Sequence, residues 1–327
     1  MGAPNDAELR AGLEQALAGV GLELAGEIER RPSPYRTSFP IEELRFQPAG
    51  REPTRVGFKQ LDWDRLEPDA QLAKPRFLHD PEREAEAYRG LLPQAPPGPP
   101  EFFGAVLEDG RRWLFVEWVE GRELFQVGER ELWEEAARWL ARFHVALAPE
   151  VERGRREAHL LDHDAAFYRR WVERARELAA DPKPIEWLAA RHEQVVEALV
   201  AMPRTVLHGE FYASNVLVAS GFEHTPVCRD PDARVAPVDW ELAAVGAGLT
   251  DLAALVSGWP EEDRAAIAAA YGGAPGAPAF SARDLDLARL QVAIQWLGWA
   301  PPQWEPPEGQ RHDWLGEAVA LAEELGL

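Results

Sequence analysis

The spacing of apolar and polar residues changes character about a third of the way along the chain. Up to about residue 119, short stretches of alternating apolar and polar residues predict strands, and Gly50 and Pro53 mark a turn between two of them. These predicted strands lie near residues 24–30, 38–47, 54–61, 102–107 and 112–119. Helical spacing predicts an amphipathic helix at the N-terminus and another near residues 80–92, with Pro81 at its start. The first third of the chain therefore predicts a small sheet domain with few helices.

After Gly121 the pattern becomes mainly helical, with apolar residues recurring every three or four positions. The predicted helices lie near residues 129–148, 164–180, 184–202, 249–257, 261–271, 282–299 and 311–325. A strand, a polar loop and a second strand interrupt them at residues 204–219, and a short strand follows at 235–239. We therefore predict two domains, residues 1–119 and residues 120–327.

Composition narrows the class of protein. The chain has 327 residues, of which 46% are hydrophobic, enough to give two domains a core each. No apolar run approaches the roughly 18 residues that a membrane-spanning helix needs, and the early acids Asp6, Glu8 and Glu14 do not fit a signal peptide. Cys228 is the only cysteine, which excludes an internal disulfide and fits a reducing cytoplasm.

The balance of charge is strongly acidic. The net charge is −21, and a nucleic-acid partner would require basic surface instead. A cationic substrate would be attracted to such a protein, although an acidic balance also serves solubility alone. The excess of acids is spread almost evenly over the two predicted domains, so this count does not identify a substrate pocket.

The strand–loop–strand segment at residues 204–219 carries the polar residues with the most specific spacing. Glu210 lies in the loop, and Asn215 follows five residues later, before the second strand. Asp239 ends the next predicted strand, 24 residues beyond Asn215. An acid, an amide and a second acid in this order suit a site that positions a hydroxyl group and holds magnesium against a triphosphate.

This segment resembles the aminoglycoside phosphotransferase family, the small-molecule relatives of protein kinases. The resemblance implies an α+β, bilobal protein-kinase-like fold with a small five-stranded antiparallel sheet lobe and a larger, mainly helical lobe. It also implies ATP and Mg²⁺ as cofactors. The expected acceptor is a hydroxyl group of a small molecule, such as an aminoglycoside-like antibiotic, a sugar or an amino-alcohol. We expect a cytoplasmic monomer or homodimer with no membrane or nucleic-acid partner.

On this resemblance, Asn215 and Asp239 would bind Mg²⁺, and Glu210 would be the catalytic base that orients the acceptor hydroxyl. The family usually carries Asp at the position of Glu210. The additional methylene could displace the carboxylate by about 1 Å, and a misplacement of that size can cost roughly 10²-fold in rate. Three interpretations stay open: a working base in a rebuilt pocket, a slow enzyme, and a nucleotide-binding pseudokinase with a regulatory or scaffolding role.

The resemblance assigns a phosphate-binding lysine to the first domain. Lys59, at the end of a predicted strand, would contact the α- and β-phosphates as a point charge. Such a lysine needs a carboxylate to hold it, and Glu84 in the helix near residues 80–92 best matches the family's pattern. Glu82 and Glu86 remain alternatives, because the sequence does not fix the register of that helix.

Other nucleotide contacts would come from the backbone and from hydroxyl groups. Glu117 and Val119 resemble the hinge between the lobes, where backbone carbonyl and amide groups would bind the adenine edge. Thr37 and Ser38 lie in a loop without glycine, and their hydroxyl groups are candidates for phosphate contacts.

Three further polar residues are expected to support the site. Asp251 resembles the family's Asp that braces the metal-binding loop. His144 and His208 are interpreted as structural supports of the loop that carries Glu210. Five tryptophans of the second domain are expected to pack mainly in its core, with one or two lining the acceptor pocket. They are Trp171, Trp187, Trp296, Trp299 and Trp304.

Overall fold

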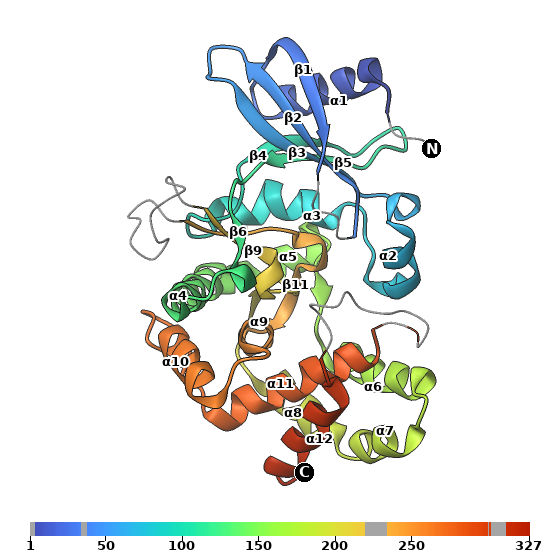
Figure 1. Ribbon diagram of the computed structural model, residues 1–327, viewed down its shortest axis with the longest axis vertical. Helices are drawn as coiled ribbons and strands as arrows, with labels where there is room; N and C mark the ends of the chain where they lie inside the picture. Colours follow the sequence, from blue (N-terminus) through green and yellow to red (C-terminus); the bar gives the residue numbers. More distant parts are fainter. Residues whose placement is uncertain (1–3, 34–37, 220–233, 300, 302–311) are drawn as a thin grey trace.

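The chain folds into two lobes of different character. A computed structural model describes residues 4–33, 38–219, 234–299, 301 and 312–327. Figure 1 shows a small lobe built on a sheet above a larger, mainly helical lobe, with the N-terminus in the first and the C-terminus at the base of the second. This is the bilobal α+β fold expected from the sequence.

The small lobe is built on one five-stranded antiparallel sheet. Its strands are β1 (Leu24–Pro32), β2 (Ile41–Pro48), β3 (Thr54–Gln60), β4 (Phe102–Val106) and β5 (Trp113–Glu117). They lie in the order β1-β2-β3-β5-β4, so every strand pairs antiparallel with its neighbours. Helix α1 (Asp6–Gly19) covers one face of this sheet, and Leu13 and Leu17 pack there with Phe115. An apolar core of its own therefore stabilises the sheet.

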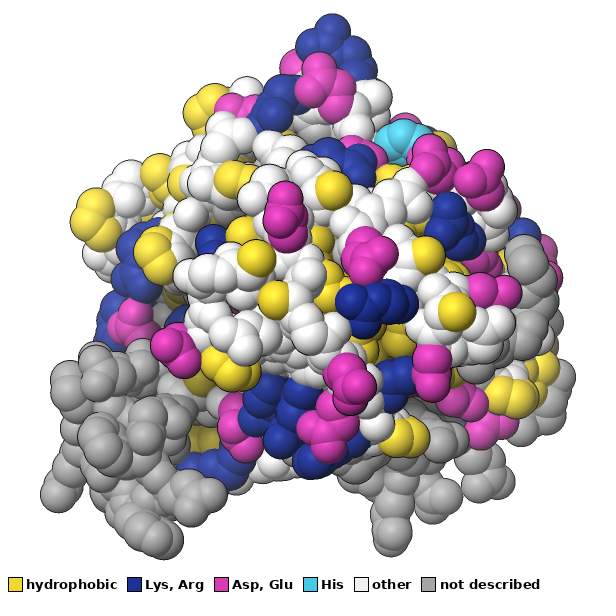
Figure 2. Space-filling model, turned by 90° about the horizontal axis from the view of Figure 1, so that it is seen from above, with side chains coloured by type: hydrophobic (Ala, Val, Ile, Leu, Met, Phe, Trp, Pro, Cys, Tyr) yellow, Lys and Arg dark blue, Asp and Glu magenta, His cyan; other side chains and the backbone are white. Residues whose placement is uncertain are grey.

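Acidic and basic side chains lie next to one another on the surface of the small lobe. Seen from above, acidic and basic side chains are intermixed on this face (Figure 2). Arg30, for example, contacts Glu42 at 2.9 Å and Asp6 at 2.7 Å. Partly exposed pairs of this kind contribute little to stability.

The segment between β3 and β4 differs from its expected structure. The helix predicted near residues 80–92 is the short α3 (Arg83–Glu86), and Ala87–Leu91 continues it as a π-helical turn. Before it, the sequence pattern left residues 62–79 unassigned, and the structure places α2 (Pro68–Ala73) there. Figure 1 shows α2 and α3 on the side of the small lobe that faces the helical lobe.

Nine helices of the described residues build the large lobe. They are α4 (Arg130–Leu147), α5 (Val151–Glu157), α6 (Ala165–Leu178), α7 (Pro182–Ala189), α8 (His192–Ala201), α9 (Leu249–Val256), α10 (Glu261–Gly272), α11 (Ala282–Leu297) and α12 (Trp314–Glu324). The prediction of a single helix over residues 184–202 is wrong, because the chain turns between α7 and α8. Arg191 fixes this turn, since its guanidinium lies 4.0 Å from the centre of the Trp187 ring and donates to the Leu327 carbonyl.

Two small sheets hold the polar loop of the large lobe. Their strands are β6 (Arg122–Glu123), β7 (Leu161–Asp162), β8 (Arg204–Leu207), β9 (Val216–Ala219), β10 (Arg234–Pro237) and β11 (Ala244–Ala247). The strands predicted on either side of residues 208–215 are present, but β8 pairs with β11 whereas β9 pairs with β10. The loop is therefore anchored in two different sheets. Within the described ranges, no helix has the length and apolar character required to cross a membrane.

Candidate active site

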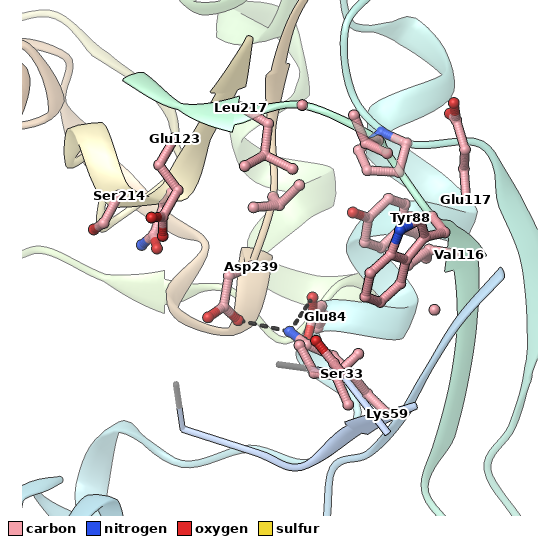
Figure 3. A pocket seen from close by; sticks show the side chains of 18 residues that line it. Ser33, Lys59, Glu84, Tyr88, Val116, Glu117, Glu123, Ser214, Leu217 and Asp239 are labelled. Carbon is pink, nitrogen blue, oxygen red and sulfur yellow. Dashed lines mark hydrogen bonds and ion pairs between the residues drawn. The ribbon is translucent and has the colours of Figure 1, made fainter. Parts of the chain in front are cut away.

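A cavity between the lobes collects most of the residues singled out in the sequence. Figure 3 shows side chains of both lobes around it. Six of the predicted site residues line it: Lys59, Glu84, Glu117, Val119, Asn215 and Asp239. Ser38 is not among the lining residues, whereas the neighbouring Ser33 is. Thr37 lies outside the described residues.

Lys59 connects the two lobes through ion pairs. Its Nζ lies 3.0 Å from Oε1 of Glu84 and 2.8 Å from Oδ1 of Asp239, as the dashed lines in Figure 3 mark. Burial alone would lower the pKa of Lys59, but Asp239 and Glu84 raise it above its usual value. The lysine therefore stays protonated and supplies a fixed positive charge in the cavity.

The structure also decides between the three acids of the helix near residues 80–92. Glu84 is the one that contacts Lys59, through both of its oxygens. Glu82 instead pairs with Arg112 at 2.8 Å, and Glu86 pairs with Arg89. Glu84 thus takes the position that best matched the family's pattern.

Asp239 projects into the cavity from an unusual backbone conformation. It follows β10 and has φ of 65°, in the left-handed region that residues other than glycine rarely adopt. The next residue holds this turn in place, because Trp240 donates its backbone N–H to Glu84 at 3.3 Å and packs its ring 4.4 Å from that of His208. Burial would raise the pKa of Asp239, but Lys59 lowers it, so the carboxylate is ionised.

Asn215 is brought to the same end of the cavity by strand pairing. In the β9–β10 ladder Val216 is opposite Pro237, and the Asn215 carbonyl accepts the Val238 N–H at 2.9 Å. The side-chain nitrogen of Asn215 donates to the Glu210 carbonyl at 3.0 Å, which leaves the amide oxygen as the atom that could bind a cation.

This pair of oxygen donors fits magnesium chemistry. Mg²⁺ is commonly held by one or two protein groups, and phosphates and water complete its octahedron. A carboxylate at Asp239 and an amide oxygen at Asn215 match that donor set. Within the described part of the chain there is no cluster of three or more His, Cys, Asp or Glu side chains that could hold a metal ion by itself. A Mg²⁺ ion on these two donors would need phosphate and water oxygens to complete its octahedron.

The loop that carries Glu210 is held from beneath by a buried carboxylate. Asp251 accepts the backbone N–H groups of His208 at 2.7 Å and Gly209 at 3.0 Å. His144 binds the same carboxylate through Nε2 at 3.2 Å, which supports its expected structural position. Asp251 therefore braces the loop of residues 208–215, which carries Glu210 and ends at Asn215, one of the two residues expected to bind a metal.

The two residues before Glu210 fix the course of this loop. Burial lowers the pKa of His208, so its ring is neutral. The ring donates from Nε2 to the Val238 carbonyl at 2.9 Å and accepts the Glu210 N–H at Nδ1, at 3.3 Å. Gly209 has φ of 88°, and a Cβ there would lie 2.1 Å from the Leu242 carbonyl oxygen. Only glycine fits this close approach.

Glu210 lies in a different electrostatic setting from the residues of the cavity. Burial raises the pKa of its carboxyl to about 8, and Glu241 adds to the rise, while Lys74 opposes it. Within the described part of the chain, Glu210 forms no ion pair. Its protonation therefore depends first on burial, and then on the opposing charges of Glu241 and Lys74.

Sequence reasoning missed a second lysine from the small lobe. Lys74 follows α2 and pairs with Glu241, and only 4% and 7% of the two side chains are exposed. Arg83 of α3 adds a hydrogen bond of 2.8 Å to the Glu241 carbonyl. Glu241 lies two residues after Asp239. Two lysines of the small lobe therefore bind the same turn, Lys59 at Asp239 and Lys74 at Glu241. Lys74 and Glu241 are 167 residues apart, and a contact at that separation leaves no periodic signal in one sequence. Only the acid at position 241, two residues after Asp239, could have suggested it.

Aromatic side chains extend from the loop of Glu210 into the helical lobe. The hydroxyl of Tyr212 accepts a hydrogen bond from Nε1 of Trp296 at 2.8 Å. The Trp296 ring stacks on Trp314 at 5.4 Å and contacts Trp299 at 5.9 Å. All four side chains are partly buried. Trp171 is fully buried, as expected for core packing, and Trp304 lies outside the described residues.

Comparison with known structures shows where this fold occurs. The GDP complex of aminoglycoside 2'-phosphotransferase-IIIa is 14% identical, with a TM-score of 0.55 and coverage of 98% of both chains. A putative aminoglycoside phosphotransferase from Ralstonia eutropha is 15% identical, with a TM-score of 0.61 and coverage of 97% of both. Macrolide 2'-phosphotransferase MphH from Brachybacterium faecium is 17% identical, with a TM-score of 0.56, covering 95% of this chain and 97% of that one.

Sequence comparison gives the family. A search of curated proteins finds no match. The sequence profile of the phosphotransferase enzyme family (APH) matches residues 71–292, about two thirds of the chain. The matched region begins in α2 and includes the loop of Glu210, Asn215 and Asp239. The chain therefore belongs to the phosphotransferase enzyme family and is a small-molecule kinase that acts on hydroxyl groups.

Proposed function

We propose that this protein transfers the γ-phosphoryl group of ATP, bound with Mg²⁺, to a hydroxyl group of a small molecule. The observation that carries the proposal is the bridge from Lys59 to Glu84 and Asp239, beside Asn215, in one cavity between the lobes. Phosphoryl transfer needs fixed positive charge and a metal site on the phosphates, and this group of residues offers both. Related folds were solved with GDP or AMP, which supports a nucleotide in the corresponding place.

The nucleotide would lie along the lining of the cavity. The backbone at Glu117 and Val119 would bind the adenine edge, and Lys59 would contact the α- and β-phosphates. Asn215 and Asp239 would hold Mg²⁺, which neutralises charge on the phosphates when bound. Thr37 and Ser38 stay candidates for phosphate contacts. The boundary between residues 119 and 120 then separates a nucleotide-binding lobe from a lobe that binds the acceptor.

Glu210 would orient the acceptor hydroxyl and take its proton. A carboxylate suits this role because it accepts a hydrogen bond from the hydroxyl as the oxygen attacks. Asp251 and His208 hold the backbone of its loop, so the side chain extends toward the acceptor from a fixed backbone position. This favours the working base in a rebuilt pocket over the pseudokinase interpretation.

The acceptor would lie between Glu210 and the aromatic side chains of the helical lobe. Tyr212 and Trp296 offer ring faces, which suit sugar rings, macrolide surfaces and cationic amino groups. The acidic balance of the chain favours cationic acceptors as well. We therefore propose an aminoglycoside-like antibiotic, a macrolide, a sugar or an amino-alcohol as the acceptor class.

An ADP-release assay tests this proposal. Purified protein is incubated with ATP, Mg²⁺ and a pooled library of antibiotics, sugars and amino-alcohols. We expect acceptor-dependent release of ADP that is lost in Asp239→Ala and kept in Asp69→Ala, an exposed acid of α2. Mg²⁺-dependent binding of ATP without turnover for any acceptor would instead identify a pseudokinase. Equal turnover in Asp239→Ala would contradict the proposed metal site.

A further inference from the structure

A second cavity lies within the helical lobe, separate from the one between the lobes. Its volume is about 580 Å³, within the roughly 300–1,000 Å³ typical of pockets for small molecules. It lies among the C-terminal ends of α4 and α8, the start of β8, the end of α10 and the start of α11. None of the residues proposed above to bind the nucleotide or acceptor lines it.

The chemistry of this second cavity is mainly apolar. Most of its wall comes from side chains such as Val145, Ala198, Met202, Leu249 and Phe280. A ligand that covers such a surface gains the free energy of removing apolar area from water.

The two charged residues of the wall already have partners. Arg204 binds Asp162 and the Val245 carbonyl. Asp284 forms a reciprocal capping box with Ser281 at the start of α11. The two charges are opposite in sign, and a ligand ion would have to displace an existing partner. The lining therefore favours a molecule without net charge.

The inner wall of this cavity is connected to the loop of Glu210. Tyr271 and His144, both lining residues, share a hydrogen bond of 2.8 Å between Oη and Nδ1. His144 then binds Asp251, and Asp251 binds the N–H groups of His208 and Gly209. Nε2 of His144 faces the Asp251 carboxylate and donates to it, and Nδ1 on the other side of the ring shares the hydrogen bond with Tyr271.

This connection is tightly packed. The side chains of Tyr271, His144 and Asp251 are each at most 2% exposed. A Cβ added at Gly248 would lie 2.8 Å from Nδ1 of His144 and 3.1 Å from Oη of Tyr271. A shift of Tyr271 or His144 would therefore be transmitted to the hydrogen bonds beneath the loop, because these side chains are in close contact with one another.

We propose that this second cavity binds a small, uncharged, mainly apolar molecule, and that its occupancy is coupled to the nucleotide site through Tyr271, His144 and Asp251. A ligand against this wall stabilises the hydrogen bonds that hold the loop, and Asn215 binds the same loop. Occupancy should therefore increase affinity for Mg·nucleotide, and nucleotide should increase affinity for the cavity ligand by the same factor.

A fluorinated aryl alcohol serves as the probe for binding. The probe is 4-(trifluoromethyl)benzyl alcohol, and ¹⁹F NMR titration measures its affinity for the full-length protein without any turnover. We expect saturable binding and at least about tenfold weaker binding of the matched anion, 4-(trifluoromethyl)benzoate. Ala198→Phe should fill the cavity and weaken probe binding about tenfold or more. The matched control is Ala265→Phe, on an exposed position of α10 outside the cavity, and should bind the probe like the wild type.

The coupling is tested on the same probe with a nonhydrolysable Mg·ATP analogue. We expect the analogue to tighten probe binding by about fivefold or more in the wild type. Tyr271→Phe keeps the ring but removes the hydroxyl that binds His144, so this variant should bind the probe and lose the effect of the analogue. Thermal unfolding of each variant checks that it is folded.

Four results would overturn the inference. Absence of saturable probe binding, or unchanged binding in folded Ala198→Phe, would contradict the site. Tighter binding of the benzoate would contradict the chemical class. If the affinity of the wild type for the probe does not change when the analogue is added, and calorimetry shows that the analogue is bound, the coupling is contradicted. Failure of the analogue to bind at all would count against the proposed nucleotide site, and the Ala198→Phe comparison would still decide whether the second cavity binds a ligand.

Discussion

The proposed nucleotide end and the proposed acceptor end of the site differ in how buried charge is balanced. At the nucleotide end, Lys59 lies between Glu84 and Asp239, and direct ion pairs from both lobes balance the charges. At the acceptor end, Glu210 has no such partner in the described structure, and Lys74, the cation that most lowers its pKa, is bound to Glu241. The ion pairs of the nucleotide end are thus present before any ligand binds. The acid at the acceptor end, Glu210, has no partner in the described structure until a cation or a hydroxyl group of the substrate binds it.

The nucleotide end should be the more sensitive to loss of one charge. Lys59→Met removes the cation that both Glu84 and Asp239 contact, and leaves two buried carboxylates facing each other. We expect kcat/KM for ATP to fall by about 10²–10³-fold. Steady-state kinetics with ATP varied measures this loss. A comparable loss in Lys183→Met, a lysine on the exposed surface of α7, would show that the effect is not specific to the site.

The acceptor end should respond to the length of one side chain. Glu210→Gln removes the base, and we expect kcat to fall about 10²-fold or more. Glu210→Asp keeps the charge but withdraws it by one methylene, and a loop built around Glu should then lose about tenfold. Single-turnover measurements at saturating ATP separate this effect from nucleotide binding. A gain of activity in Glu210→Asp would mean that Glu210 is a damaged base rather than an adapted one.

The raised pKa of Glu210 predicts a pH dependence at the acceptor end alone. A base must be ionised, so kcat/KM for the acceptor should rise with pH up to about 8. The same shift affects folding, because the folded state binds this proton more tightly than the unfolded state. The contribution to stability is complete below the ordinary pKa of 4.5 and is lost as pH rises toward about 8, at up to about 1.4 kcal/mol per pH unit.

A matched variant isolates both effects. Glu210→Gln should flatten this part of the stability curve, as measured by denaturant unfolding at several pH values. An acceptor profile that is flat between about pH 6 and pH 9 would contradict the role of Glu210 as base.

The contrast between the two ends also separates what the sequence predicted from what it did not. Asn215 directly precedes one strand and Asp239 follows the next at a specific spacing, and Glu84 lies in a helix with a recognisable start, so local pattern and resemblance placed them near one cavity. Lys74 lies in a segment without periodicity, and its partner is far away along the chain. The break between α7 and α8 escaped prediction for the same reason, since Arg191 stabilises it by binding the distant Leu327 carbonyl. Local propensity cannot reveal contacts that depend on how distant segments meet.

Substitution of Lys74 should raise the pKa of Glu210 further, because it removes positive charge from the acceptor end. Lys74→Met leaves Glu241 without its partner and removes the main cation that opposes the raised pKa of Glu210. The acceptor pH profile should move to higher pH by about one unit, a loss of about tenfold at neutral pH. Combining Lys74→Met with Glu241→Gln removes both charges and should restore most of the profile. If the double variant is as impaired as the single one, Lys74 acts by packing rather than by charge.

The smallest expected effect concerns selection of the acceptor. Trp296→Phe keeps an aromatic ring against Trp314 but removes the N–H that donates to Tyr212. One hydrogen bond of this kind contributes about 1 kcal/mol, so KM for the acceptor should rise about fivefold, while KM for ATP stays the same. Tyr212→Phe removes the other side of the bond, and the double variant should cost no more than either single one, because all three lack the same interaction. Equal changes in both KM values would place Trp296 in the support of the whole site. A change confined to the acceptor would show that the two ends can be altered separately, as expected if ion pairs fix one and aromatic packing shapes the other.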